Sequence, residues 1–63
     1  MNASGKDEIL FEFVTQGHVV KATAIHAATG AEASIVGPAH AGRQVLAQAA
    51  LRKLQYVLAK KQC

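Results

Sequence analysis

The sequence predicts an α+β fold in which a three-stranded antiparallel β-meander, of strand order 1-2-3, packs on one long C-terminal α-helix. Three β-rich runs are separated by glycine-containing turns, the two hairpins agree on which face is apolar, and residues 38–61 have helical periodicity. We therefore expect one β-β-β-α domain over residues 8–61, with a flexible leader at residues 1–7 and a flexible tail at residues 62–63.

The first strand is predicted at residues 8–14, a run rich in aromatic and β-branched side chains. Gly17 supplies the positive φ that a tight turn requires, so a two-residue turn at residues 16–17 should lead into a second strand at residues 18–27. The expected cross-strand pairs are Phe13–Val20, Phe11–Ala22 and Ile9–Ala24 on the inner face, and Val14–Val19, Glu12–Lys21 and Leu10–Thr23 on the outer face.

A second turn, centred on Thr29-Gly30, should lead to a third and shorter strand at residues 32–36, which Gly37-Pro38 ends. The expected pairs are Ala24–Ile35 and His26–Ala33 on the inner face, and Ile25–Ser34 and Thr23–Val36 on the outer face. Both hairpins place the same face of the central strand inward, and this agreement supports the meander.

A helix is predicted at residues 38–61, because Pro38 suits a first helical turn and apolar residues recur at helical spacing. Gly42 weakens the first turn, so the regular helix could begin as late as Ala41. At about 1.5 Å per residue this helix is longer than the strands and should overhang the sheet at its C-terminal end. The stripe that should cover the sheet consists of Leu46, Ala47, Ala50, Leu51, Leu54, Val57 and Leu58.

A chain of 63 residues permits one domain with a small core, which usually needs support from disulfides, metals or oligomers. Cys63 is the only cysteine, so no internal disulfide is possible and a reducing compartment is expected; oxidation could link two copies. No run reaches the roughly 20 apolar residues of a membrane span, and residues 1–8 lack the apolar core of a signal peptide. We expect a soluble cytoplasmic protein with no membrane partner.

The outer face of the predicted sheet is apolar, although no second helix exists to cover it. We expect this face, the back of the helix, or both to carry self-association into a homodimer, or contact with another protein. A slightly apolar monomer is the alternative. The exposed first strand could also pair edge to edge with its copy. The candidate interaction residues are Leu10, Val14, Val19, Ile25 and Val36 on the sheet, and Val45, Ala49 and Tyr56 on the helix.

The formal net charge is +3, and the last third of the chain contains cations but no acidic residue. Weak nucleic-acid binding, to RNA in particular, is therefore the alternative function. The charges are scattered around the helix axis without an aromatic platform, which favours a solvated helix surface. The candidate phosphate contacts are Arg43, Arg52, Lys53, Lys60 and Lys61.

No residue pattern indicates a metal, cofactor or catalytic site. His18 and His40 should lie at one end of the sheet and His26 at the other, without the further ligands that a zinc site needs. Ser34 has no base beside it, and the glycine-flanked helix start at residues 37–42 lacks the Lys and Ser/Thr of a phosphate-binding loop. The sequence thus predicts a protein that is not an enzyme and has no cofactor.

Parts of this sequence resemble two protein families. Residues 29–30 (Thr-Gly), 34–38 (Ser-Ile-Val-Gly-Pro), 49–54 (Ala-Ala-Leu-Arg-Lys-Leu) and 56–59 (Tyr-Val-Leu-Ala) resemble a family of small uncharacterised alphaproteobacterial proteins, which implies a bacterial cytoplasmic protein without a known site. Three antiparallel strands followed by a helix with an Ala-Ala-Leu segment are also similar to the C-terminal part of a double-stranded-RNA-binding domain. That family has a lysine cluster at the start of its final helix, whereas residues 38–42 contain no lysine.

Overall fold

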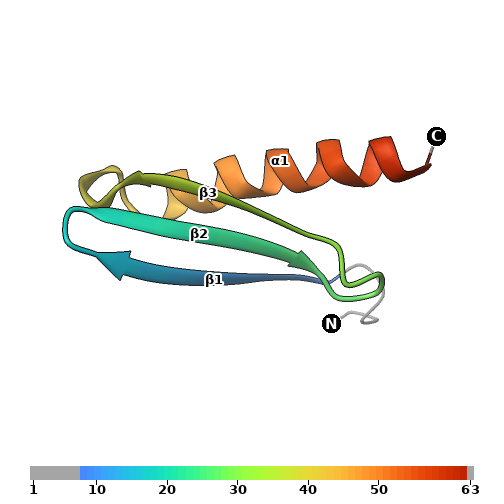
Figure 1. Ribbon diagram of the computed structural model, residues 1–63, viewed down its shortest axis with the longest axis horizontal. Helices are drawn as coiled ribbons and strands as arrows, with labels where there is room; N and C mark the ends of the chain where they lie inside the picture. Colours follow the sequence, from blue (N-terminus) through green and yellow to red (C-terminus); the bar gives the residue numbers. More distant parts are fainter. Residues whose placement is uncertain (1–7, 63) are drawn as a thin grey trace.

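The computed structural model describes residues 8–62, so the expected leader at residues 1–7 and the tail residue Cys63 lie outside the described part of the chain. Three strands come first, followed by a 3-10 turn and a helix: β1 (Ile9–Gln16), β2 (Val19–His26), β3 (Glu32–Pro38), η2 (Ala39–Ala41) and α1 (Arg43–Gln62). The strands form an antiparallel sheet of order β1-β2-β3, and α1 lies on one face of it (Figure 1). The predicted β-β-β-α fold is confirmed.

The first hairpin differs from the expected register by two residues. Its loop consists of Gly17 and His18, so Phe13 lies opposite Ala22 and Glu12 lies opposite Thr23. Gly17 has a φ of +60° at the first loop position, which is where a type II′ turn takes its glycine. The two-residue turn expected at residues 16–17 would have placed Gln16 at the first loop position, where both common hairpin turns take a positive φ, and this is unfavourable for glutamine. Because the shift is even, every side chain keeps its expected face.

The second hairpin is also shifted by two residues, since Ala24 lies opposite Ala33 and not opposite Ile35. Its loop contains the four residues 27–30 and is closed by hydrogen bonds from His26 N–H to the Ala31 carbonyl and from Gly30 N–H to the His26 carbonyl, both 2.8 Å. The Thr29 hydroxyl supports this longer loop, because it accepts from Ala31 N–H at 3.2 Å and lies 2.8 Å from His26 Nδ1.

The helix starts later than the sequence predicts. Pro38 is the last residue of β3, with an extended backbone (φ −71°, ψ 141°), and is not part of a helical turn. Gly42 then has a φ of +91°, which separates η2 from α1, and the α-helix begins at Arg43. At its other end, α1 extends beyond the β2–β3 turn, as expected from its length (Figure 1). Gln62 is the last residue of α1.

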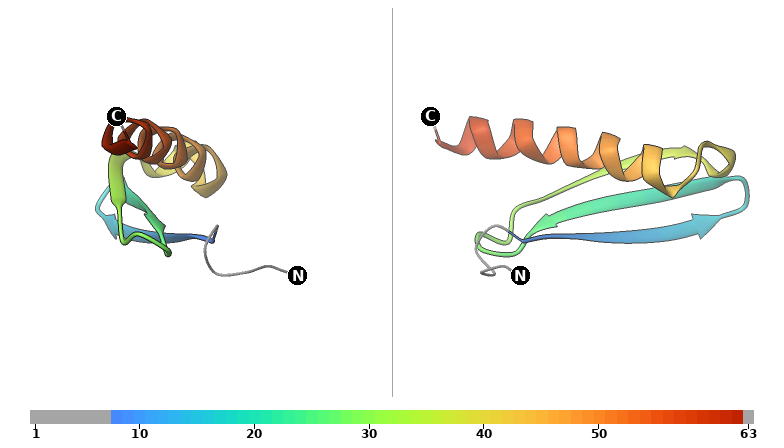
Figure 2. Two further views of the ribbon diagram at one scale, coloured as in Figure 1. Left: turned by 90° about the vertical axis from the view of Figure 1, so that its right-hand side faces the viewer. Right: turned by 180° about the vertical axis from the view of Figure 1, so that it is seen from behind.

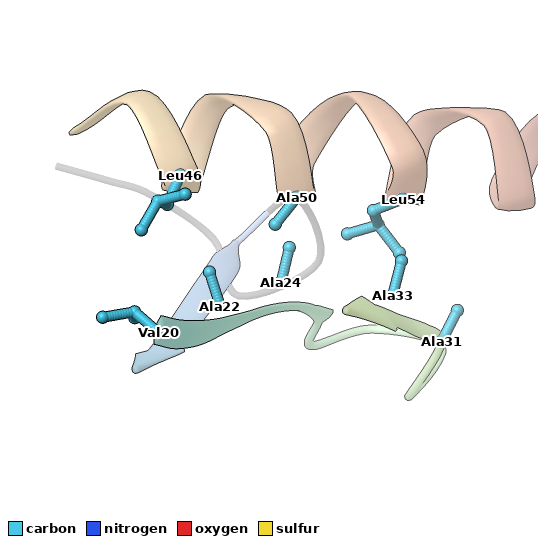
Figure 3. Close-up of a cluster of buried hydrophobic side chains, with 8 residues drawn as sticks. All are labelled: Val20, Ala22, Ala24, Ala31, Ala33, Leu46, Ala50 and Leu54. Atoms are coloured by element: carbon cyan, nitrogen blue, oxygen red, sulfur yellow. The ribbon is translucent and has the colours of Figure 1, made fainter. Parts of the chain in front are cut away.

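The core lies between α1 and the two strands β2 and β3. Small side chains on the sheet let the helix approach closely, and Ala50 of α1 packs above Ala22 and Ala24 with no exposed area on any of the three (Figure 3). Leu54 is the largest fully buried side chain and lies above Ala33. Among the described residues, the buried apolar side chains are Val20, Ala22, Ala24, Ala31, Ala33, Leu46, Ala50 and Leu54.

Strand β1 lies at the margin of the area that α1 covers, where Ile9 and Phe13 pack against the core. The helix packs against β3 and β2, and the end-on view shows β1 at the far side of the sheet (Figure 2). Phe11 was expected on the inner face and covered by the helix. It does lie on the inner face, but the expectation that it is covered is wrong, because its side chain is 40% exposed. Phe13 is half-buried, and the Arg43 guanidinium lies over its ring at 5.3 Å from the centroid. A helix about 10 Å wide spans roughly two strand spacings, so the third strand is left at the margin.

Candidate interaction surfaces

Strand β1 exposes apolar side chains on both of its faces. Leu10 and Val14 on the outer face are 46% and 51% exposed, and Phe11 on the inner face is exposed because α1 does not reach it. An edge strand that is apolar on both faces is unusual in a stable monomer, because it can serve as a template for another strand.

The backbone of β1 adds hydrogen-bonding groups to this apolar edge. Ala27 N–H donates to the Glu8 carbonyl at 3.0 Å, and the pairing of Gln16 with Val19 closes the turn, so the even-numbered residues of β1 bond to β2. By alternation, the N–H and C=O groups of the odd-numbered residues point away from the sheet. These residues are Ile9, Phe11, Phe13 and Thr15. Within residues 8–62 we find no hydrogen bond to these outward groups.

The opposite edge, formed by β3, is partly protected. The Lys53 Nζ of α1 reaches over this edge and donates to the Ser34 carbonyl oxygen at 2.9 Å. Pro38 ends the strand without an N–H group. Lysine and proline at an edge both oppose the addition of another strand. Among the described residues, β1 is therefore the more open of the two sheet edges.

The five predicted interaction residues on the sheet share the outer face, but a polar row divides them. The row consists of Glu12, Thr23 and Ser34, which lie opposite one another on the three strands. The Thr23 and Ser34 hydroxyl oxygens are 2.8 Å apart, and Thr23 is buried. On one side of the row, a shallow hollow is lined by Val14, Gln16, Val19, Lys21 and Val36. Leu10 and Ile25 lie on the other side. The apolar surface of the outer face is therefore divided into two smaller patches.

The three predicted interaction residues on the helix belong to a different surface. Val45 and Tyr56 are 59% and 63% exposed, and Ala49 is exposed as well. They are exposed, whereas Ala50 and Leu54 of the same helix are buried, so they lie on a different side of α1 from the core. Because α1 covers the inner face, the sheet lies between the helix and the outer sheet face (Figure 2). A single flat contact with one partner cannot cover both surfaces.

The predicted phosphate contacts are not gathered on one face. Arg43 lies over Phe13, Lys53 binds the Ser34 carbonyl, and Lys60 lies over the Tyr56 ring at 5.5 Å from the centroid. Arg52 is exposed, and the side chain of Lys61 lies outside the described part. Three of these cationic side chains thus contact other residues of the same chain, each at a different place. Nucleic-acid binding stays a prediction from the sequence.

The histidines occupy the places that the sequence predicts. His18 lies in the β1–β2 turn, where its carbonyl accepts from Ala39 N–H at 2.8 Å, and His40 lies nearby in η2. His26 is at the opposite end of β2. Among the described residues, no three His, Cys, Asp or Glu side chains come together as metal ligands would. Within the same residues, no helix combines the length and apolarity that crossing a bilayer requires.

The fold and its edges define a small β-β-β-α domain with one partly protected and one more open edge strand. The chain belongs to the family described as a domain of unknown function (DUF6898), whose model matches residues 6–61. The expected membership of an uncharacterised family is thereby confirmed. No curated protein matches the chain. No solved structure matches it either.

Proposed function

We propose that this domain is a non-enzymatic self-association module that acts as a homodimer in the bacterial cytoplasm. The observation that carries the proposal is the open β1 strand, which exposes Leu10, Phe11 and Val14 on its two faces. Beside them lie backbone groups that have no hydrogen-bond partner among residues 8–62. Strand addition uses both features, because main-chain hydrogen bonds supply affinity and the alternating side chains supply specificity.

The composition of the core supports the same proposal. Five of its eight buried apolar residues are alanines, so little apolar area is removed from water within one copy. Small domains of this kind commonly gain stability by burying further area against another chain. The single cysteine and the resemblance to bacterial proteins support a reducing bacterial cytoplasm as the place of action.

Sedimentation velocity in reducing buffer, over a range of micromolar concentrations, tests the proposal. We expect a monomer–dimer equilibrium that shifts toward the dimer as concentration rises. The reducing agent excludes linkage through Cys63. A protein that sediments as a monomer at high micromolar concentration would contradict self-association.

A further inference from the structure

We infer that two copies pair antiparallel through their β1 strands, about a two-fold axis at Phe11, and so form one continuous six-stranded sheet. This inference rests on the proposed self-association and specifies the surface, the partner and the register. The partner is a second copy of this chain, because the β1 edge can satisfy its own outward hydrogen-bonding groups when it is paired with itself.

The direction of the outward N–H and C=O groups of β1 restricts the symmetry of the dimer. Only the odd-numbered residues of β1 point their N–H and C=O groups away from the sheet, so odd residues must pair with odd residues of the second copy. Residues directly opposite each other in an antiparallel pair project to the same face, so the inner face of one copy continues into the inner face of the other. The two-fold axis is therefore perpendicular to the sheet, and both helices lie on the same side.

The position of α1 leaves room for this arrangement. Because each helix lies over β2 and β3, four strand spacings, or about 19 Å, would separate the two helix axes. Packed helices need only about 8–10 Å between their axes, so the helices do not collide. A helix placed over β1 would have blocked the same edge.

The side chains of β1 select among the possible registers. An axis at Glu12 would place two carboxylates directly opposite each other, which is unfavourable. An axis at Phe13 would place Phe11 opposite Thr15. An axis at Phe11 pairs Phe11 with its copy and Ile9 with Phe13, so every inner-face pair between two β1 residues is apolar. It also buries the exposed Phe11 ring.

A cysteine scan tests the register. In a Cys63→Ser background, Phe11→Cys, Glu12→Cys and Phe13→Cys each carry one thiol, and only a residue on the axis lies opposite its own copy. The Cα–Cα distance of about 5.5 Å in a hydrogen-bonded pair suits a disulfide. We expect Phe11→Cys to form the interchain disulfide roughly tenfold faster than the other two. Equal rates, or a faster reaction at either neighbour, would overturn the register.

Sedimentation of two lysine variants tests the surface. Phe11→Lys places like charges on the axis and should raise the dimer dissociation constant roughly tenfold or more. Val36→Lys is the matched control, since Val36 is even more exposed, at 65%, but lies on the partly protected edge strand. We expect its dissociation constant to stay within about twofold of the wild type.

The outcomes separate this inference from the proposed function. A dimer that persists in Phe11→Lys overturns pairing through β1 and leaves self-association intact, whereas a monomeric wild type overturns both. If circular dichroism shows that Phe11→Lys does not fold, a synthetic chain with an N-methylated Phe11 amide replaces it. That change removes one outward N–H group and keeps the ring. The same loss of dimer supports the inference, and an unchanged dimer overturns it.

Discussion

At the scale of single residues, the contact between α1 and the sheet depends on side chains that are small or absent. Gly37 is the clearest case, because a Cβ at this position would overlap the Leu46 Cδ2 atom. Leu46 is buried and has little freedom to move away. The sequence offered a different interpretation of Gly37, as a residue that ends the third strand, because the neighbour that requires its small size comes from α1.

We expect Gly37→Ala to lower the free energy of unfolding by about 1–3 kcal/mol, which is the usual cost of overpacking. Urea denaturation monitored by circular dichroism would measure it. Adding Leu46→Val should recover part of the loss if the overlap is its cause. A Gly37→Ala variant as stable as the wild type would show that Leu46 adapts without cost.

Two neighbouring alanines of α1 lie in different environments. Ala50 is completely buried against the sheet, and Ala49 is exposed. Ala50→Leu should therefore lower the free energy of unfolding by about 1–3 kcal/mol. Ala49→Leu should change it by no more than about 0.5 kcal/mol. Similar values for the two variants in thermal or urea denaturation would contradict the placement of α1.

At the scale of elements, the periodicity of the sequence determines the faces of the strands better than it determines their pairing. The alternation of apolar and polar residues predicts the inner and outer faces correctly, because a shift of two residues leaves it unchanged. The register depends on the turns. Gly17 fits either position of a two-residue loop, and the side-chain contacts of Thr29 that support the four-residue loop appear only in the folded chain.

The contact between Lys53 and the β3 edge should limit pairing of that edge with another chain. Lys53→Met keeps an apolar side chain of similar length but removes the donor to the Ser34 carbonyl, so the β3 edge should become available for pairing. We expect species larger than a dimer at high protein concentration, measured by light scattering after size exclusion. Arg52→Met, which removes an exposed charge at the neighbouring position, is the control. If both variants behave alike, lost charge and not an opened edge explains the effect.

At the scale of the whole molecule, one helix covers two strands of a three-stranded sheet. The apolar stripe of α1 was predictable from spacing alone, and so was the location of Leu46, Ala50 and Leu54 in the core. The exposure of Phe11 was not, because periodicity assigns a residue to a face without stating how far the helix extends across it. The sequence does predict one helix and three strands, and a single helix is too narrow to cover three strands. That comparison of widths could have predicted an uncovered strand.

Amide hydrogen exchange of β1, measured residue by residue by NMR at low and high protein concentration, tests the central claim most directly. The amides of Glu12 and Val14 bond to β2 and should be protected at both concentrations. The amides of Phe11 and Phe13 point outward and should exchange rapidly in dilute solution, then become protected as the dimer forms. Rapid exchange of Phe11 and Phe13 at every concentration, or their protection in the dilute monomer, would contradict an open strand that serves for self-association.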